Sequence, residues 1–218
     1  MTDIVFNWRG GLYDIINDPR EKSDLTATKP KVLKRLKREL DGWLGQVSLK
    51  SSREPAMRPI TLAHPDAEFT QLPSRDAKAH GGVRRSNRFP NCTFMTNWKN
   101  PEDSISWDVE VLGSGDFEVQ MYYACKQADV GSKIELSVGD QKIEKMIEVA
   151  NEVPLLGADE DRFERVEGYV RDWRPMTLGV VQLQPGKATL TLRAREVAGD
   201  EVADMRLLLF RRIRSTGE

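Results

Sequence analysis

The chain has 218 residues, with 33 Lys or Arg and 34 Asp or Glu, so its formal net charge is -1. This balance gives the protein no overall field to attract nucleic acid or an anionic membrane, and we expect neither as a partner. No stretch approaches the roughly 18 consecutive apolar residues that cross a bilayer. The length is that of one large domain or two small ones.

The first 47 residues predict a β-hairpin followed by a helix. Residues 4–8 and 12–16 favour strands, and the Arg-Gly-Gly between them favours a turn. Apolar side chains then recur at intervals of three and four, which is typical of one face of a helix. They are Val32, Leu33, Leu36, Leu40, Trp43, Leu44 and Val47. A hairpin and one helix bury too little surface to be stable alone, so this apolar stripe needs a partner, either the downstream domain or a second copy.

The middle of the chain changes in composition. Residues 48–71 have scattered prolines and no sustained period, and we interpret them as a linker. An irregular lead-in begins at residue 72, so we place the second domain at 72–218. Cys92 and Cys125 could pair if they meet in space, but the simpler interpretation is two ordinary thiols.

From residue 105 the apolar period becomes two. Alternate residues are apolar over 105–111 and again over 117–123, with a Gly-Ser-Gly turn between these runs. Further strands are predicted at 133–138, 141–149, 178–183, 188–194 and 204–213. This pattern predicts a mainly β protein with a C-terminal antiparallel, jelly-roll-like β-sandwich.

Two parts of the chain resemble known families. The run from Leu12 to Leu25 contains Leu-Tyr-Asp, Asp-Pro-x-Glu and Asp-Leu in that order. It resembles the signature near the C-terminal end of formylglycine-dependent sulfatases of the arylsulfatase and N-acetylgalactosamine-6-sulfatase type, and the lead-in at 72–98 resembles a stretch of planctomycete-like sulfatases. Residues 100–214 resemble the β-sandwich of carbohydrate-binding modules and galactose-binding-like domains.

The sulfatase resemblance implies the C-terminal part of such an enzyme without its active site. The family's catalytic signature, Cys-x-Pro-x-Arg, fits neither Cys92 nor Cys125, so this chain alone is expected to be inactive. The implied function is that of the non-catalytic part of a sulfatase acting on sulfated glycans. The implied partner is a sulfatase catalytic domain, or a second copy bound through the helix stripe. Two alternatives stay open: a stand-alone glycan-binding module, and a structural domain that orients a sulfatase catalytic domain.

The expected localisation depends on whether the chain is part of a longer sulfatase. The N-terminus lacks the basic, apolar and small-residue regions of a signal peptide. We therefore expect a cytoplasmic protein if synthesis starts at Met1, and an extracytoplasmic one if the chain is part of a longer exported sulfatase.

A carbohydrate-binding sandwich needs an exposed aromatic ring for the apolar face of a sugar, together with planar hydrogen-bonding side chains. A sulfated sugar adds arginine, whose guanidinium offers a fork of donors to sulfate oxygens. The candidates are Trp98, Asn97, Arg84, Arg85, Tyr122 and Trp173. The alternative interpretation places Trp98 in the core and uses the arginines to tie the lead-in to the sandwich.

The sequence contains no clear motif for catalysis or for metal binding. His64 and His80 have no motif around them, so a hydrolytic triad is not expected. The acidic cluster at 159–161 could offer oxygen ligands to calcium, but it lacks the glycine and the spacing of a calcium loop. A structural calcium ion elsewhere in the sandwich is implied only by the resemblance to carbohydrate-binding modules, without named ligands.

Overall fold

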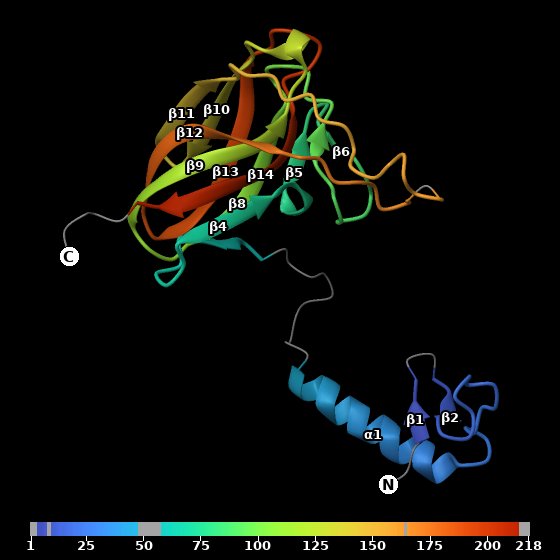
Figure 1. The fold of residues 1–218 in the computed structure, drawn as a ribbon. Coiled ribbons are helices and arrows are strands. Elements are labelled where there is room, and N and C mark those ends of the chain that lie inside the picture. The colour runs from blue at the N-terminus through green and yellow to red at the C-terminus, as the bar shows by residue number, and fades with distance from the viewer. Residues whose placement is uncertain (1–3, 8–9, 48–57, 164, 214–218) are drawn as a thin grey trace. The chain divides into compact units, whose positions relative to one another are not determined.

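The computed structural model describes residues 4–7, 10–47, 58–163 and 165–213. The chain divides into two compact units, residues 1–57 and 58–218. Figure 1 shows one helix in the smaller unit and a strand-rich larger unit. No helix among the described residues is long and apolar enough to span a membrane.

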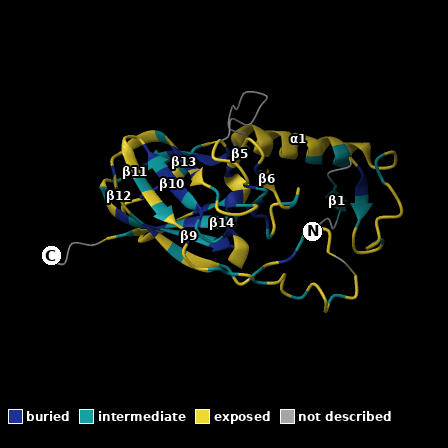
Figure 2. Cartoon of the chain, turned by 90° about the horizontal axis from the view of Figure 1, so that it is seen from above, coloured by how far each residue is buried: buried dark blue, intermediate teal, exposed yellow. Residues whose placement is uncertain are grey.

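The N-terminal unit contains the predicted hairpin and helix. Its elements are β1 (Ile4–Phe6), β2 (Leu12–Asp14) and α1 (Pro30–Val47). Figure 2 shows that α1 is exposed along most of its length. In its second half, Leu40, Trp43 and Leu44 are 38%, 57% and 41% exposed. The described part of this unit therefore leaves half of the apolar stripe uncovered, and pairing with a second copy stays a prediction.

The larger unit is a sandwich of two sheets. The β8 sheet has the strand order β11-β10-β13-β8-β3, with β5 also paired to β8. The β9 sheet has the order β12-β9-β14-β7-β6, with β4 also paired to β14. The strands are β3 (Ile60–Leu62), β4 (Phe69–Pro73), β5 (Lys78–His80), β6 (Arg84–Arg85), β7 (Met95–Thr96), β8 (Ser104–Val111), β9 (Gly115–Ala124), β10 (Lys133–Val138), β11 (Gln141–Met146), β12 (Arg174–Leu183), β13 (Gly186–Glu196) and β14 (Asp204–Arg212).

The core lies between the two sheets, because alternate residues of each strand point inward. The largest fully buried side chains of the sandwich are Trp98, Trp107, Tyr123, Phe117 and Phe210. The ring N–H of each tryptophan donates a hydrogen bond inside the core. Nε1 of Trp98 donates to the carbonyl of Asp103 at 3.2 Å, and Nε1 of Trp107 donates to the carbonyl of Pro73 at 3.1 Å. The hydrogen bond from Trp107 on β8 to Pro73 thus joins the start of the lead-in to the sandwich.

A buried carboxylate organises the end of the lead-in. Asp103 is 2% exposed, and it accepts backbone N–H groups from Gly82 at 2.7 Å, Lys99 at 3.1 Å and Asn100 at 3.0 Å. Gly81 has φ +71°, and a Cβ there would lie 2.2 Å from Oδ1 of Asp103, so this approach requires glycine. Burial alone would raise the pKa of Asp103, but the hydrogen bonds outweigh burial and hold it below the usual value.

The mainly β fold and the sandwich are confirmed, and the domain boundary is corrected. The predicted linker at 48–71 is too long, because β3 and most of β4 lie within it and pair with the two sheets. Leu62, on β3, is fully buried. These strands have only three and five residues and lie among prolines. They are therefore too short to show the alternation of apolar and polar residues that predicts a strand. The sandwich unit therefore begins at residue 58 and not at 72, and residues 48–57 lie outside the described part of the chain.

Candidate functional site

The outer face of the β9 sheet presents two straight rows of side chains across four strands. The strand register sets Tyr122 between Pro175 on β12 and Leu207 on β14, and Gln120 between Thr177 and Leu209. β4 extends each row by one residue, with Pro73 opposite Leu207 and Gln71 opposite Leu209. The intervening residues, such as Met121 and Leu208, are buried. We call these two rows the platform: Pro175, Tyr122, Leu207 and Pro73, then Thr177, Gln120, Leu209 and Gln71.

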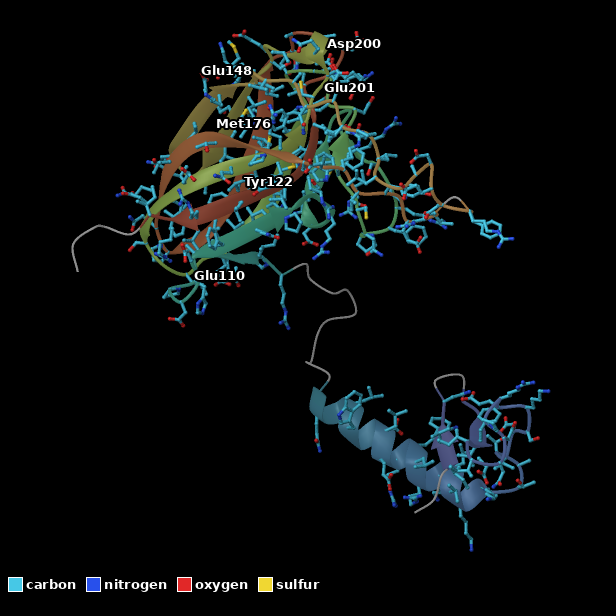
Figure 3. The ribbon with its side chains drawn as sticks, in the orientation of Figure 1. Glu110, Tyr122, Glu148, Met176, Asp200 and Glu201 are labelled. Atoms are coloured by element: carbon cyan, nitrogen blue, oxygen red, sulfur yellow. The ribbon has the colours of Figure 1, made fainter. Side chains whose placement is uncertain are left out.

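The platform is open and carries no charge. All of its eight residues are exposed or half-buried, although 31% of the chain is charged. Figure 3 labels Tyr122 on β9, in the sheet nearer the viewer. Strands lie about 4.8 Å apart, so each row spans about 14 Å. The surface combines apolar side chains with amide and hydroxyl groups.

An ion pair closes one side of the platform. In the next row, Arg211 on β14 stands opposite Glu118 on β9, and their side chains are 3.0 Å apart. Gln120 donates its amide N–H to the same carboxylate at 3.1 Å. The charges nearest to the platform are therefore paired with each other.

An aromatic and arginine cluster closes the other side. The rings of Phe94 and Trp173 are 5.2 Å apart, and the Arg171 guanidinium lies 4.7 Å from the Phe94 ring and 5.8 Å from the Trp173 ring. Arg171 also pairs with Asp204 at 2.5 Å. Stacking and ion pairing together fix this arginine beside the half-buried Trp173 ring.

A polar pocket of about 530 Å³ lies beside this cluster. Its charged lining residues are Lys126, Asp129, Glu152, Arg171, Glu201 and Asp204. Most of these groups are bonded within the protein: Asp129 accepts N–H groups from Asp200 and Glu201, and Glu152 accepts that of Gln127. The pocket offers a ligand fewer free groups than its composition suggests.

The thiol of Cys125 also lines this pocket. Burial raises its pKa to about 11, and the carboxylates of Asp129, Glu152 and Asp204 add to the effect. A thiol held in its protonated form is a poor nucleophile. Cys92 and Cys125 are both free, as the simpler interpretation predicts.

Two sequence-predicted site residues are structural. Trp98 is fully buried, so its ring has no face for a sugar, and the alternative that placed it in the core is the correct one. Asn97 has φ +58°, and its side-chain amide donates to the carbonyl of Gly82 at 2.7 Å. It holds the lead-in loop.

The two predicted arginines lie apart from the predicted aromatic residues. Arg84 and Arg85 form β6, the edge strand of the β9 sheet, and both are exposed. Arg85 donates to the carbonyl of Arg75, a contact within the lead-in itself. Two strands, β7 and β14, separate β6 from β9, which carries Tyr122. The structure brings Tyr122 and Trp173 onto one face and leaves both arginines at its edge.

The sequence analysis missed most of the platform. One signal for an apolar outer face was available in the run Leu207, Leu208 and Leu209. Three consecutive apolar residues in a strand place apolar side chains on both faces of the sheet. Gln71 and Phe94 lie in irregular stretches and gave no signal. The described residues contain no group of three or more His, Cys, Asp or Glu that could hold a metal, so the calcium expectation has no support in them.

Comparisons with known proteins agree with the sandwich fold. No family model matches the chain, and no curated protein matches its sequence. Among solved structures, it is similar to the Cry4Aa toxin from Bacillus thuringiensis, with 13% identity over 72% of this chain and 25% of that chain and a TM-score of 0.52. It is similar to the GH26-CBM35 β-(1,4)-mannanase of Podospora anserina, with 11% identity over 68% of this chain and 28% of that chain and a TM-score of 0.48.

A third similar structure is a family 35 carbohydrate-binding module from Clostridium thermocellum, with 14% identity over 66% of this chain and 98% of that chain and a TM-score of 0.44. This chain spans only about a quarter of the toxin and of the mannanase. At such identities the likeness concerns the fold alone. Nothing in these comparisons supports the sulfatase resemblance, which stays a prediction.

Proposed function

We propose that the chain is a carbohydrate-binding module whose glycan lies on the outer face of the β9 sheet. The observation that carries the proposal is the position of Tyr122, an accessible aromatic ring in an open row flanked by the amides of Gln120 and Gln71. Sugar rings have apolar C–H faces and a rim of hydroxyl groups. A flat apolar floor with neighbouring amides complements both.

Trp173 supplies a second accessible ring at the end of the same face. Arg171 and Phe94 hold it in place through ring contacts. A ring that is fixed before binding loses little conformational entropy when a ligand stacks on it. Tyr122 and Trp173 would thus contact successive parts of one glycan, and the polar pocket would border its end.

Replacement of Tyr122 with alanine tests this proposal. We expect the affinity of the full chain for its glycan to fall about tenfold or more, equivalent to about 1.4 kcal/mol, because the stacking surface is lost. Isothermal titration calorimetry with a polysaccharide selected from a broad glycan panel measures the change. Phe163→Ala is the matched control, since this aromatic ring is 77% exposed and lies in the connection between β11 and β12.

The control variant should bind like the wild type. Equal losses in Tyr122→Ala and Phe163→Ala would contradict the assignment to the platform. Failure of the wild type to bind any member of the panel would overturn the function itself.

The sulfatase tail stays a second candidate on the sequence resemblance of residues 12–25 alone. Carboxylates of the sulfatase-like run accept local backbone N–H groups: Asp14 from Asn17, Asp18 from Ser23, and Asp24 from Leu12. Such bonds build a turn and are not specific to sulfatases. The test is the intact mass of the native protein captured from its own cells. A mass well above 24.8 kDa together with aryl sulfate hydrolysis supports this candidate, and a mass of 24.8 kDa without a co-purifying sulfatase contradicts it.

A further inference from the structure

We infer that the glycan bound by the platform is an uncharged chain and not a sulfated one. This inference rests on the proposed function and names its ligand class. It departs from the sulfated ligand that the sequence resemblance implies.

The platform has no cationic group to bind a sulfate. Its residues are proline, leucine, threonine, glutamine and tyrosine, without a lysine, arginine or histidine. Sulfate oxygens bind best to guanidinium or ammonium donors. A sulfate pressed against Leu207 and Leu209 would lose water and gain no cationic partner, which is costly.

The arginines around the platform are engaged by the protein. Arg211 pairs with Glu118, Arg171 pairs with Asp204, and Arg206 donates to the carbonyl of Thr93. The two arginines that pair with carboxylates, Arg171 and Arg211, have their charge largely balanced already. An anionic ligand would also meet the carboxylates of Glu118 and Asp204 at the two sides of the face.

Arg174, Arg84 and Arg85 lie outside the two rows. Arg174 on β12 pairs in register with Tyr123, whose side chain is buried in the core, and not with the outward Tyr122. Arg84 and Arg85 are on β6, which is separated from β9 by β7 and β14. No arginine, lysine or histidine among the described residues belongs to the two rows.

The groups that the platform does offer suit hydroxyl groups. An amide has both donors and acceptors, and Thr177 and Tyr122 add hydroxyl groups that can serve as either. These neutral groups match the mixed donor and acceptor character of sugar hydroxyls. Because each row extends for about 14 Å across four strands, the ligand is a chain of several sugars lying across the strands.

The test compares neutral and sulfated polysaccharides on the full 218-residue chain. Affinity gel electrophoresis would use mixed-linkage β-glucan, xyloglucan, galactomannan and dextran as neutral probes, with carrageenan, heparin and dextran sulfate as sulfated ones. We expect at least one neutral polymer to retard the protein. Its affinity should change less than about twofold between ~50 and ~200 mM salt, since no ion pair forms on binding.

Two variants distinguish binding of a neutral glycan on the platform from binding of a sulfated glycan through Arg84 and Arg85. Gln71→Ala should weaken binding to the neutral polymer about threefold or more, because Gln71 is exposed and its amide is in the second row. Arg84→Ala with Arg85→Ala should leave that binding unchanged.

Three outcomes are decisive. Salt-insensitive binding to a neutral polymer, lost on removal of the Tyr122 ring, supports the inference. Binding only to sulfated polymers, with strong salt dependence and loss in the Arg84 and Arg85 variant, overturns the inference and leaves a carbohydrate-binding module. No binding to any polymer overturns the proposed function as well.

Discussion

Replacing Trp98 with alanine is expected to destabilise the sandwich by about 3–5 kcal/mol. The ring is fully buried, so its removal leaves a large cavity. It also removes the ring N–H that donates to the carbonyl of Asp103. Denaturant unfolding of the full chain, followed by near-ultraviolet circular dichroism, measures the loss.

Trp43→Ala is the matched control for this prediction. Trp43 is 57% exposed and belongs to the N-terminal unit, so its loss should leave the unfolding of the sandwich within about 0.5 kcal/mol of the wild type. If Trp98→Ala instead kept full stability and lost glycan binding, Trp98 would be a ligand contact, as one sequence interpretation held.

Replacing Asp103 with alanine is expected to cost about 2–4 kcal/mol at neutral pH. Three backbone N–H groups would lose their acceptor, and the turn between β7 and β8 would lose the group around which it closes. Urea unfolding of the wild type and the variant at pH 7 measures this difference. Asp66→Asn is the control, since the side chain of Asp66 is 93% exposed.

The effect should depend on pH with a defined sign. The folded state holds the pKa of Asp103 below its usual value, so its contribution is complete above the unfolded pKa of about 3.9. It is lost as pH falls through the lower, folded value. The difference between wild type and Asp103→Ala should therefore shrink under acid, and an equal difference at pH 7 and at pH ~3 would contradict this account.

The parts of the fold that sequence predicts well are those with a local period. The β8 and β9 strands alternate apolar and polar residues over eight and ten residues, and the apolar stripe of α1 extends over much of its 18 residues. β3, β5, β6 and β7 have two or three residues each. They exist because a neighbouring strand pairs with them, so no local pattern marks them.

The candidate site was predicted less completely for a related reason. The alternation of β9 already places Tyr122 opposite to the buried Tyr123. Gln71, Gln120 and Leu209 become neighbours only through the register of three strands that lie far apart in sequence. Trp98 was predicted as an exposed sugar-binding ring, but the ring is buried. It lies in an irregular segment, where no alternation of apolar and polar residues tells a buried ring from an exposed one.

The pairing of β4 with β14 has a consequence for how the chain folds. β4 ends at Pro73 and β14 begins at Asp204, and Ser74 donates to the carbonyls of Met205 and Arg206. Contacts of such sequence separation slow folding, because a long loop must close before they form. During synthesis, β4 and β9 cannot pair with β14 until β14 has left the ribosome. We therefore expect the β9 sheet to form only after β14 has emerged, and a chain stalled before β14 to expose two unpaired strand edges that favour aggregation.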